Sequence, residues 1–329
     1  MRSMTGSLLI LMVFFLAVIS SCGDGGGDGG KTDLVIFHAG SLSVPLKRMA
    51  ALYMEKNPEV NVLLEAAGSR ACARKISELG RECDVMASAD YTVIDQLLIP
   101  DHASWNIKFA GNEMTIVYHE ESMRSDEIDA DNWFMILMED NVAFGRSDPN
   151  SDPCGYRAVF TMRLAETHYG MAGLADGFLE KDKRYIRPKE TDLIALLESG
   201  VIDYIFLYRS VAQQHGLDYL ILPSEINLGD LEMAGTYGKV SVEISGKKPG
   251  HWIVKKGAPM VYGVTIPSNA PHPEIARSFI EYLLTEDMGM AVMTECGQPS
   301  VLPSYTDTYD ALPERLRRFA LPEKPGNQL

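Results

Sequence analysis

The sequence predicts an α/β protein in which two lobes enclose a cleft, and three observations lead to this fold class. From residue 33 onward, short apolar runs alternate with segments of helical spacing, an order typical of parallel sheets covered by helices. The chain has 329 residues, 46% of them hydrophobic, which is enough for two medium-sized cores. No linker rich in Ser, Pro or Gly interrupts residues 32–310, so the chain must cross between lobes through ordered strands.

The first residues are predicted to be a leader that is not part of the fold. The apolar run Leu8–Ile19 is shorter than the roughly 20 residues that span a bilayer, so residues 1–21 are interpreted as a signal peptide. An apolar residue and two serines precede Cys22, a pattern typical of a lipobox, and residues 23–31 form a glycine-rich tether. We therefore expect an exported protein that is anchored to a membrane through lipid on Cys22. The alternative is an ordinary cleaved signal peptide with a chance cysteine.

Helices and strands are predicted to alternate along the rest of the chain. The predicted strands cover residues 33–38, 61–67, 83–89, 113–119, 142–145, 204–208, 219–222 and 260–267. The predicted helices cover residues 43–56, 69–79, 91–98, 132–138, 153–168, 190–199, 209–215, 272–284 and 286–294. Residues 229–257 are expected to be irregular or antiparallel.

Two of these strands are candidates for the crossings between lobes, namely 113–119 and 260–266. Lobe one would then consist of residues 32–115 and 263–329, the latter including a C-terminal tail, and lobe two of residues 116–262. A cleft between two lobes is the usual place for a ligand.

The same Ala-Gly-Ser pattern follows two successive predicted strands. It occurs in FHAGSLSVP (37–45), which contains Ser41, and in LLEAAGSRACARK (63–75), which contains Ser69. Both serines are expected at the carboxyl ends of parallel strands and at the start of a helix, where free N–H groups favour an anion. A single such serine is more often a helix N-cap. Two on successive strands favour one small anion held by hydroxyl and amide groups.

An acidic loop, GRSDPNSDPCGYR, occupies residues 145–157. Its spacing of Asp148, Asn150 and Asp152 matches the start of a calcium loop, but the sixth position is Pro153 and the twelfth is Val159, where glycine and glutamate are required. The loop therefore argues against calcium. From the residues alone, Asp152 is better interpreted as a helix N-cap followed by proline at the first helical position.

Several long stretches resemble the archaeal-type molybdate/tungstate-binding proteins of ABC importers. The similar stretches are EAAGS (65–69), DPCGYR (152–157), LIALLESGVIDYIFLYRSVAQQHGL (193–217), LPSEINLGD (222–230) and VYGVTIPSNA (261–270). The resemblance runs from about Leu34 to about Pro303. It implies the fold of class II periplasmic binding proteins, with two α/β lobes, two crossing strands and the ligand in the cleft. It also implies a monomer that works with an ABC permease and its ATPase.

The resemblance further implies which residues bind the oxyanion. Ser41 and Ser69 would donate hydrogen bonds to its oxygen atoms, and Tyr208 would donate another. Asp152 and Glu190 would add carboxylate oxygens to the metal. No separate cofactor is implied, because the oxyanion is the ligand.

The second carboxylate remains open between Glu190 and Asp192, which lies two residues further on. Two carboxylates beside a dianion repel it. Mo(VI) and W(VI) can accept two more oxygen ligands, whereas tetrahedral sulfate cannot, so sulfate would meet only the repulsion. The ligand set does not distinguish tungstate from molybdate.

Two other functions remain as alternatives. A binder of phosphate or sulfate would also use the serines, with a carboxylate accepting the proton of hydrogen phosphate. A secreted serine hydrolase would need a base for Ser41, and His38 lies three residues away. The sequence contains no GxSxG, HExxH, P-loop or GxGxxG motif in a strand–helix context, so we expect no enzyme activity.

Charge and cysteine content exclude further classes of protein. The net charge of −15 argues against nucleic acid or an anionic membrane surface as a partner. Apart from Cys22 there are four cysteines, Cys72, Cys83, Cys154 and Cys296, with no CxxC pair. A Cys72–Cys83 disulfide and buried free thiols both remain open.

Overall fold

The computed structural model describes residues 30–248 and 250–322, and the residues from Lys31 onward form one compact unit. The predicted signal peptide, Cys22 and nearly all of the predicted tether lie outside the described residues. Within the described ranges, none of the helices has the length and apolar character needed to cross a bilayer.

The first five-stranded sheet has the order β2-β1-β3-β12-β4, and we call the part of the chain around it lobe 1. Strand β1 pairs in parallel with β2 and β3, while β12 runs antiparallel to β3 and β4. The strands are β1 (Thr32–Ala39), β2 (Val60–Ala67), β3 (Val85–Ser88), β4 (Ile107–Gly111) and β12 (Val261–Thr265). The remaining elements of lobe 1 are η1 (Gly40–Leu42), α1 (Ser43–Lys56), α2 (Ser69–Ser77), α3 (Tyr91–Leu97), α11 (Pro273–Leu284), α12 (Gly289–Glu295), β13 (Ser304–Thr306), η5 (Tyr309–Ala311), η6 (Glu314–Phe319) and β14 (Ala320–Pro322).

The second five-stranded sheet has the order β7-β6-β8-β5-β9, and the part of the chain around it is lobe 2. Strand β6 pairs in parallel with β7 and β8, and β5 runs antiparallel to β8 and β9. The strands are β5 (Met114–Tyr118), β6 (Phe144–Ser147), β7 (Ile186–Arg187), β8 (Tyr204–Tyr208) and β9 (Asp218–Leu220). The helices are α4 (Trp133–Ile136), α5 (Pro153–His168), α6 (Leu174–Lys181), η2 (Asp182–Tyr185), η3 (Glu190–Leu193), α7 (Ile194–Glu198), α8 (Arg209–His215), α9 (Ser224–Asn227), η4 (Leu231–Met233) and α10 (Ala234–Tyr237). An antiparallel hairpin, β10 (Ser241–Ser245) and β11 (Trp252–Lys256), completes lobe 2.

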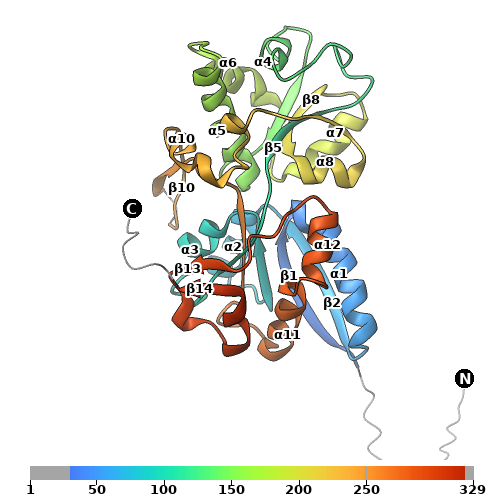
Figure 1. Cartoon of the computed structure of the whole chain (residues 1–329), viewed down its shortest axis with the longest axis vertical. Helices are drawn as coiled ribbons and strands as arrows, with labels where there is room; N and C mark the ends of the chain where they lie inside the picture. Colours follow the sequence, from blue (N-terminus) through green and yellow to red (C-terminus); the bar gives the residue numbers. More distant parts are fainter. Residues whose placement is uncertain (1–29, 249, 323–329) are drawn as a thin grey trace, which may run out of the picture. The chain divides into compact units, whose positions relative to one another are not determined.

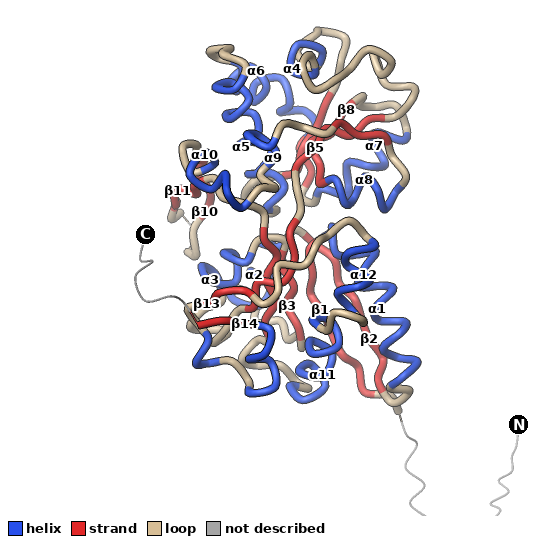
Figure 2. Tube along the Cα trace, viewed as in Figure 1, coloured by secondary structure: helices blue, strands red, loops and turns tan. Residues whose placement is uncertain are grey.

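The chain passes between the two sheets twice. It leaves lobe 1 after β4 and enters lobe 2 with β5, and it returns between β11 and β12. Figure 1 shows two segments that connect the lobes, one of them next to β5. Helices cover both sheets in the trace of Figure 2. Both crossings are short: only residues 112–113 separate β4 from β5, and residues 257–260 separate β11 from β12.

Local sequence explains where the long helices begin. Helix α5 starts at Pro153, which needs no N–H partner in the first turn, and the Asp152 carboxylate accepts a hydrogen bond from the Cys154 N–H as N-cap. Helix α11 likewise starts at a proline, Pro273. The sequence-based expectation that Asp152 caps a helix is therefore confirmed.

The predicted α/β fold class is confirmed, and residues 229–257 contain the antiparallel hairpin that was one of the two expectations for them. Several elements inside the described residues were missed, namely the strands β4, β7, β13 and β14, the helices α6 and α9, and the short 3₁₀ helices η2, η5 and η6. Strand β4 is only five residues long, and α6 contains Gly177, which lowers helix propensity. Both are held by tertiary packing, which a local pattern does not contain.

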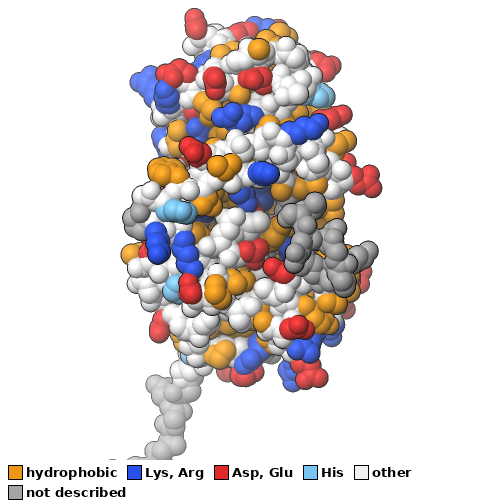
Figure 3. All heavy atoms as spheres, turned by 90° about the vertical axis from the view of Figure 1, so that its left-hand side faces the viewer, with side chains coloured by type: hydrophobic (Ala, Val, Ile, Leu, Met, Phe, Trp, Pro, Cys, Tyr) orange, Lys and Arg blue, Asp and Glu red, His pale blue; other side chains and the backbone are white. Residues whose placement is uncertain are grey.

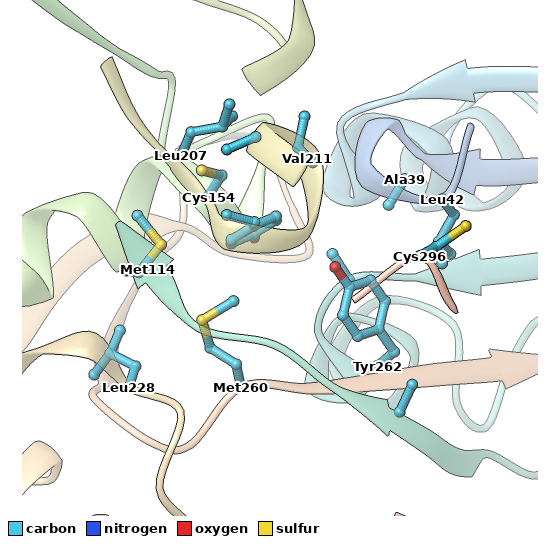
Figure 4. Close-up of a cluster of buried hydrophobic side chains, with 14 of the residues drawn as sticks. Ala39, Leu42, Met114, Cys154, Leu207, Val211, Leu228, Met260, Tyr262 and Cys296 are labelled. Carbon is cyan, nitrogen blue, oxygen red and sulfur yellow. The ribbon is translucent and has the colours of Figure 1, made fainter. Parts of the chain in front are cut away.

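A large cluster of buried apolar side chains draws members from both lobes. Figure 4 shows Met114, Cys154, Leu207 and Val211 from lobe 2, together with Tyr262 from lobe 1. Apolar packing thus continues from one lobe to the other beside the crossing segments.

The four cysteines of the described residues are buried free thiols. Burial raises the pKa of the Cys72 thiol to about 12 and also raises that of Cys83. Of the two alternatives for Cys72 and Cys83, the structure therefore contains buried free thiols and not a disulfide.

Candidate functional site

All five predicted ligand-binding side chains of the fold are buried. Ser41, Ser69 and Tyr208 are 0% exposed, and Asp152 and Glu190 are 1% exposed. The serines come from lobe 1, directly after β1 and β2, whereas the other three come from lobe 2. The site is therefore assembled from both lobes.

Glu190 lies against the first Ala-Gly-Ser elbow. A Cβ atom added to Gly40 would be 2.8 Å from both carboxylate oxygens of Glu190, so any larger residue would force the Glu190 side chain to move. The Glu190 Oε2 atom is buried and has no hydrogen-bond partner among the described residues. A buried polar oxygen without a partner is costly, and such an atom points to a ligand.

Asp152 lies against the second elbow. A Cβ atom added to Gly68 would be 2.4 Å from the Ser151 carbonyl oxygen and 2.9 Å from the Asp152 Cβ. Each glycine that precedes an elbow serine thus allows one acidic residue of lobe 2 to approach lobe 1.

The two carboxylates are neighbours of each other. The Glu190 backbone N–H donates to Asp152 Oδ2 at 2.9 Å, and the Cys154 N–H donates to Asp152 Oδ1 at 3.1 Å. Burial raises the pKa of both acids, and repulsion by Asp152 raises the pKa of Glu190 further. A pair of buried carboxylates with raised pKa values is typical of a functional site.

Asp192, the alternative to Glu190, takes no part in this pair. Its side chain is 40% exposed and forms an ion pair of 3.2 Å with Lys189. The structure therefore places Glu190, and not Asp192, beside Asp152.

Neither elbow serine is a helix N-cap. Gly68 occupies the N-cap position of α2, and no side chain caps either η1 or α2. Instead, Ser69 Oγ accepts a hydrogen bond from the Ala89 N–H at 2.9 Å, and Ser41 Oγ accepts one from the Tyr262 hydroxyl at 3.0 Å. The capping alternative is thus wrong for these two residues.

Tyr208 ends strand β8 and is contacted by a buried cation. Arg157 Nη1 donates to the Tyr208 hydroxyl at 2.9 Å and to the Ala89 carbonyl at 2.8 Å. Burial raises the pKa of Tyr208 well above its usual value, so the phenol keeps its proton at neutral pH. Arg157 therefore connects Tyr208 of lobe 2 to the strand end beside Ser69.

A second polar cluster joins the lobes next to the site. Asp90 of lobe 1 accepts a hydrogen bond from the Tyr156 hydroxyl and forms an ion pair of 2.9 Å with Lys255, both from lobe 2. Burial alone would raise the pKa of Asp90, but Lys255 and Arg157 outweigh it and hold that pKa well below its usual range. These contacts bring the two lobes together.

The residues behind the site belong to no sequence pattern with an assigned role. Tyr156 and Arg157 belong to the DPCGYR stretch and Tyr262 to VYGVTIPSNA, so the resemblance included them without assigning them a role. Asp90 and Lys255 come from distant segments, and no local pattern pairs them.

The chemistry of the site suits an oxyanion better than a free metal ion. In the part of the chain that the structure describes, no group of three or more His, Cys, Asp or Glu side chains could hold a metal. Hydroxyl and amide groups supply hydrogen bonds, and a ligand that brings its own oxygen atoms would need only the two carboxylates to complete its coordination shell.

On the face shown in Figure 3, acidic and basic side chains are interspersed.

Residues 34–293 match the family of bacterial extracellular solute-binding proteins. The chain belongs to this family. A solute-binding family is not a class of enzymes, and the match agrees with a protein that acts outside the cytoplasm.

Two relatives are similar to this chain over nearly its whole length. The solute-binding protein is 44% identical to an uncharacterized solute-binding protein of Petrotoga mobilis, over 97% of this chain and 98% of the relative. It is 40% identical to the molybdate/tungstate-binding protein WtpA of Thermococcus kodakarensis, over 94% of each chain. The resemblance stated from the sequence is thus confirmed.

The likeness to one solved structure concerns the fold alone. The periplasmic molybdate-binding protein of Azotobacter vinelandii is 14% identical, with a TM-score of 0.58 over 80% of this chain and 98% of that chain.

Removing the charge of Glu190 should stabilise the protein in a pH-dependent way when no anion is added. Because its pKa is raised well above the ordinary 4.5, wild-type stability is lost as the pH rises through the raised pKa. We expect Glu190→Gln to melt at a higher temperature than wild type, with a gap that widens from pH 6 to pH 9. A widening of the melting-temperature gap by roughly 3 °C would correspond to about 1 kcal/mol in the free energy of unfolding.

Differential scanning fluorimetry measures this gap. Asp192→Asn is the matched control, because Asp192 is an exposed acid of the same segment and should leave the melting temperature unchanged at every pH. A Glu190→Gln gap that stays constant with pH would contradict the prediction.

Proposed function

We propose that this protein captures tungstate or molybdate outside the cytoplasm and delivers it to an ABC importer. The oxyanion would lie between the two Ala-Gly-Ser elbows of lobe 1 and the acidic pair of lobe 2. Ser41, Ser69 and Tyr208 would donate hydrogen bonds to its oxygen atoms. Asp152 and Glu190 would bind the metal.

The observation that carries this proposal is the buried pair of carboxylates beside two groups of hydrogen-bond donors. A site for sulfate would gain nothing from two acids next to the anion, because the repulsion is not offset by any bond. W(VI) and Mo(VI) can extend their shell from four to six oxygens, and the acids then become ligands. The unpartnered Glu190 Oε2 is the atom that such a bond would satisfy.

The names of two relatives support the same ligand. Besides the Thermococcus protein, a molybdate/tungstate-binding protein of Pyrococcus abyssi is 42% identical over 89% of this chain and 92% of the relative. The ligand set has no feature that separates tungstate from molybdate, so both belong to the proposal.

Binding would be accompanied by closure of the lobes about the two crossing segments. The Ala71 N–H donates to the Ser151 carbonyl at 3.1 Å, and Arg74 Nη1 donates to the Asn150 carbonyl at 2.7 Å. These bonds join α2 of lobe 1 to the acidic loop of lobe 2. The closed form would then be the one that docks on the permease.

Cys22 would carry the lipid that keeps the protein near its permease. Residues 23–31 would serve as the flexible tether between the lipid and the fold.

Isothermal titration calorimetry on the purified chain should show tight binding of one tungstate or molybdate, without turnover. Replacing both acids, Asp152→Asn with Glu190→Gln, should weaken tungstate binding roughly 100-fold, the effect of about 2.7 kcal/mol. Asparagine keeps the N-cap of α5, so the fold is preserved. Sulfate binding should not weaken, because sulfate has no bond to the acids.

X-ray absorption with bound tungstate should count six oxygens around the metal in wild type and four in the double variant. Asp192→Asn is again the control and should bind like wild type. An unchanged preference for tungstate over sulfate in the double variant, or tighter binding of phosphate by wild type, would argue against the proposal.

A methyl group at the second elbow should hinder closure. Gly68 has φ −57°, which alanine tolerates, but the new Cβ would be 2.4 Å from the Ser151 carbonyl oxygen. Gly68→Ala should therefore weaken tungstate binding by about tenfold or more, since about 1.4 kcal/mol is tenfold.

Gly235→Ala is the matched control for this variant. Gly235 lies in α10, and a Cβ there meets no atom within 4 Å. Equal affinities of Gly68→Ala and wild type would show that this contact is not part of the bound state.

Cys22→Ser should release the protein from the membrane. The full-length chain, expressed in a host that processes bacterial lipoproteins, should be found with the membranes, and the variant with the soluble fraction. Asp24→Asn, in the tether, should behave like wild type. Equal partition of wild type and Cys22→Ser would exclude the anchor.

A further inference from the structure

Tyr262 stands behind Ser41 and is surrounded by donors. Asn112 Nδ2 donates to the Tyr262 hydroxyl at 2.8 Å, and Gln298 Nε2 donates to it at 3.2 Å. Both lone pairs of the phenol oxygen are thereby used, so its only remaining role is to donate. It donates to Ser41 Oγ at 3.0 Å.

The two amide groups cannot easily be reversed. Asn112 Oδ1 accepts a hydrogen bond from the Glu113 N–H at 2.9 Å, which fixes the amide nitrogen toward Tyr262. Gln298 Nε2 also donates to the Ser41 carbonyl oxygen at 2.9 Å, which an amide oxygen could not do. Burial raises the pKa of Tyr262 to about 12, so it keeps its proton at neutral pH.

We infer that Tyr262, held by Asn112 and Gln298, is a positioning residue that makes the Ser41 hydroxyl a hydrogen-bond donor toward the bound oxyanion. This inference rests on the proposed function of the site. Because Ser41 Oγ already accepts from Tyr262, its proton must point elsewhere, and it has no acceptor among the described residues.

The other two hydroxyl groups of the site also accept one hydrogen bond from the protein and are free to donate their own proton. Ser69 Oγ accepts from the Ala89 N–H, and the Tyr208 hydroxyl accepts from Arg157, so each has its own proton left to donate. Three different groups, namely an amide network, a backbone N–H and a guanidinium, thus produce the same result. The hydroxyls are turned into donors before the ligand arrives, and the lone pairs of a fully deprotonated oxyanion are their matching acceptors.

A double-mutant cycle tests whether Tyr262 acts through Ser41. Tyr262→Phe removes only the hydroxyl and should weaken tungstate binding about five- to tenfold, the range for one neutral hydrogen bond. Ser41→Ala should weaken it more, about 30-fold, because it removes a bond to the anion itself. The combined variant should bind as Ser41→Ala does, within about twofold, because Tyr262 has nothing left to orient.

A residue with a merely structural role would give the opposite pattern, with the two losses multiplying in the combined variant. Multiplying losses would therefore overturn the inference while leaving the proposed function intact. Failure of the unaltered chain to bind tungstate would instead overturn the proposed function, and the inference with it.

Tyr53→Phe is the matched control. The Tyr53 hydroxyl donates to Ser278 Oγ at 3.0 Å, the same pair of groups at the same distance, between α1 and α11. Tyr53→Phe should change tungstate affinity less than twofold, alone or combined with Ser41→Ala. If Tyr262→Phe does not fold, Gln298→Met removes one donor to Tyr262, and the same cycle with Ser41→Ala gives the same two opposed outcomes.

Discussion

The structure depends most on the burial of two carboxylates next to each other. Asp152 and Glu190 are both removed from water, and each lies against a glycine of the opposite lobe. Without a ligand this arrangement is unfavourable, because burial raises the pKa values of both acids and repulsion by Asp152 raises that of Glu190 further. Such a cost is typical of sites where binding, rather than stability, has shaped the sequence.

The fold brings this pair to the elbows through its two sheets. Strands β1 and β2 are adjacent and parallel, so the elbows that follow them lie side by side at one sheet edge. The acids come from the corresponding region of lobe 2, after β6 and β7. Asp90, with Tyr156 and Lys255, joins the lobes beside them and is stabilised by opposite charge, in contrast to the acidic pair.

Neutral dipoles explain how a chain with a net charge of −15 could hold the proposed anion. The elbows supply hydroxyl and backbone N–H groups, and Arg157, the buried cation that contacts Tyr208, is shared with the Ala89 carbonyl and with Asp90. Local hydrogen bonds act at contact distance, whereas net charge acts over the Debye length of about 8 Å and is screened by salt. The sign of the protein's net charge therefore does not decide what the site binds.

Sequence alone was enough for the alternation of strands and helices, because apolar runs and helical spacing are local patterns. The start of α5 at Pro153 was also local, since an N-cap and a proline act within one turn. The five predicted site residues came from a resemblance, and their patterns alone left Ser41, Ser69 and Asp152 open to interpretation as caps.

Only the tertiary structure decided between those interpretations. It showed that the serine hydroxyls face partners far along the chain, such as Tyr262, and that Glu190 rather than Asp192 meets Asp152. It also showed Cys72 and Cys83 as free thiols. These are contacts between segments tens to hundreds of residues apart, and their geometry arises only when both lobes have folded and packed, because no local pattern encodes a distance between them.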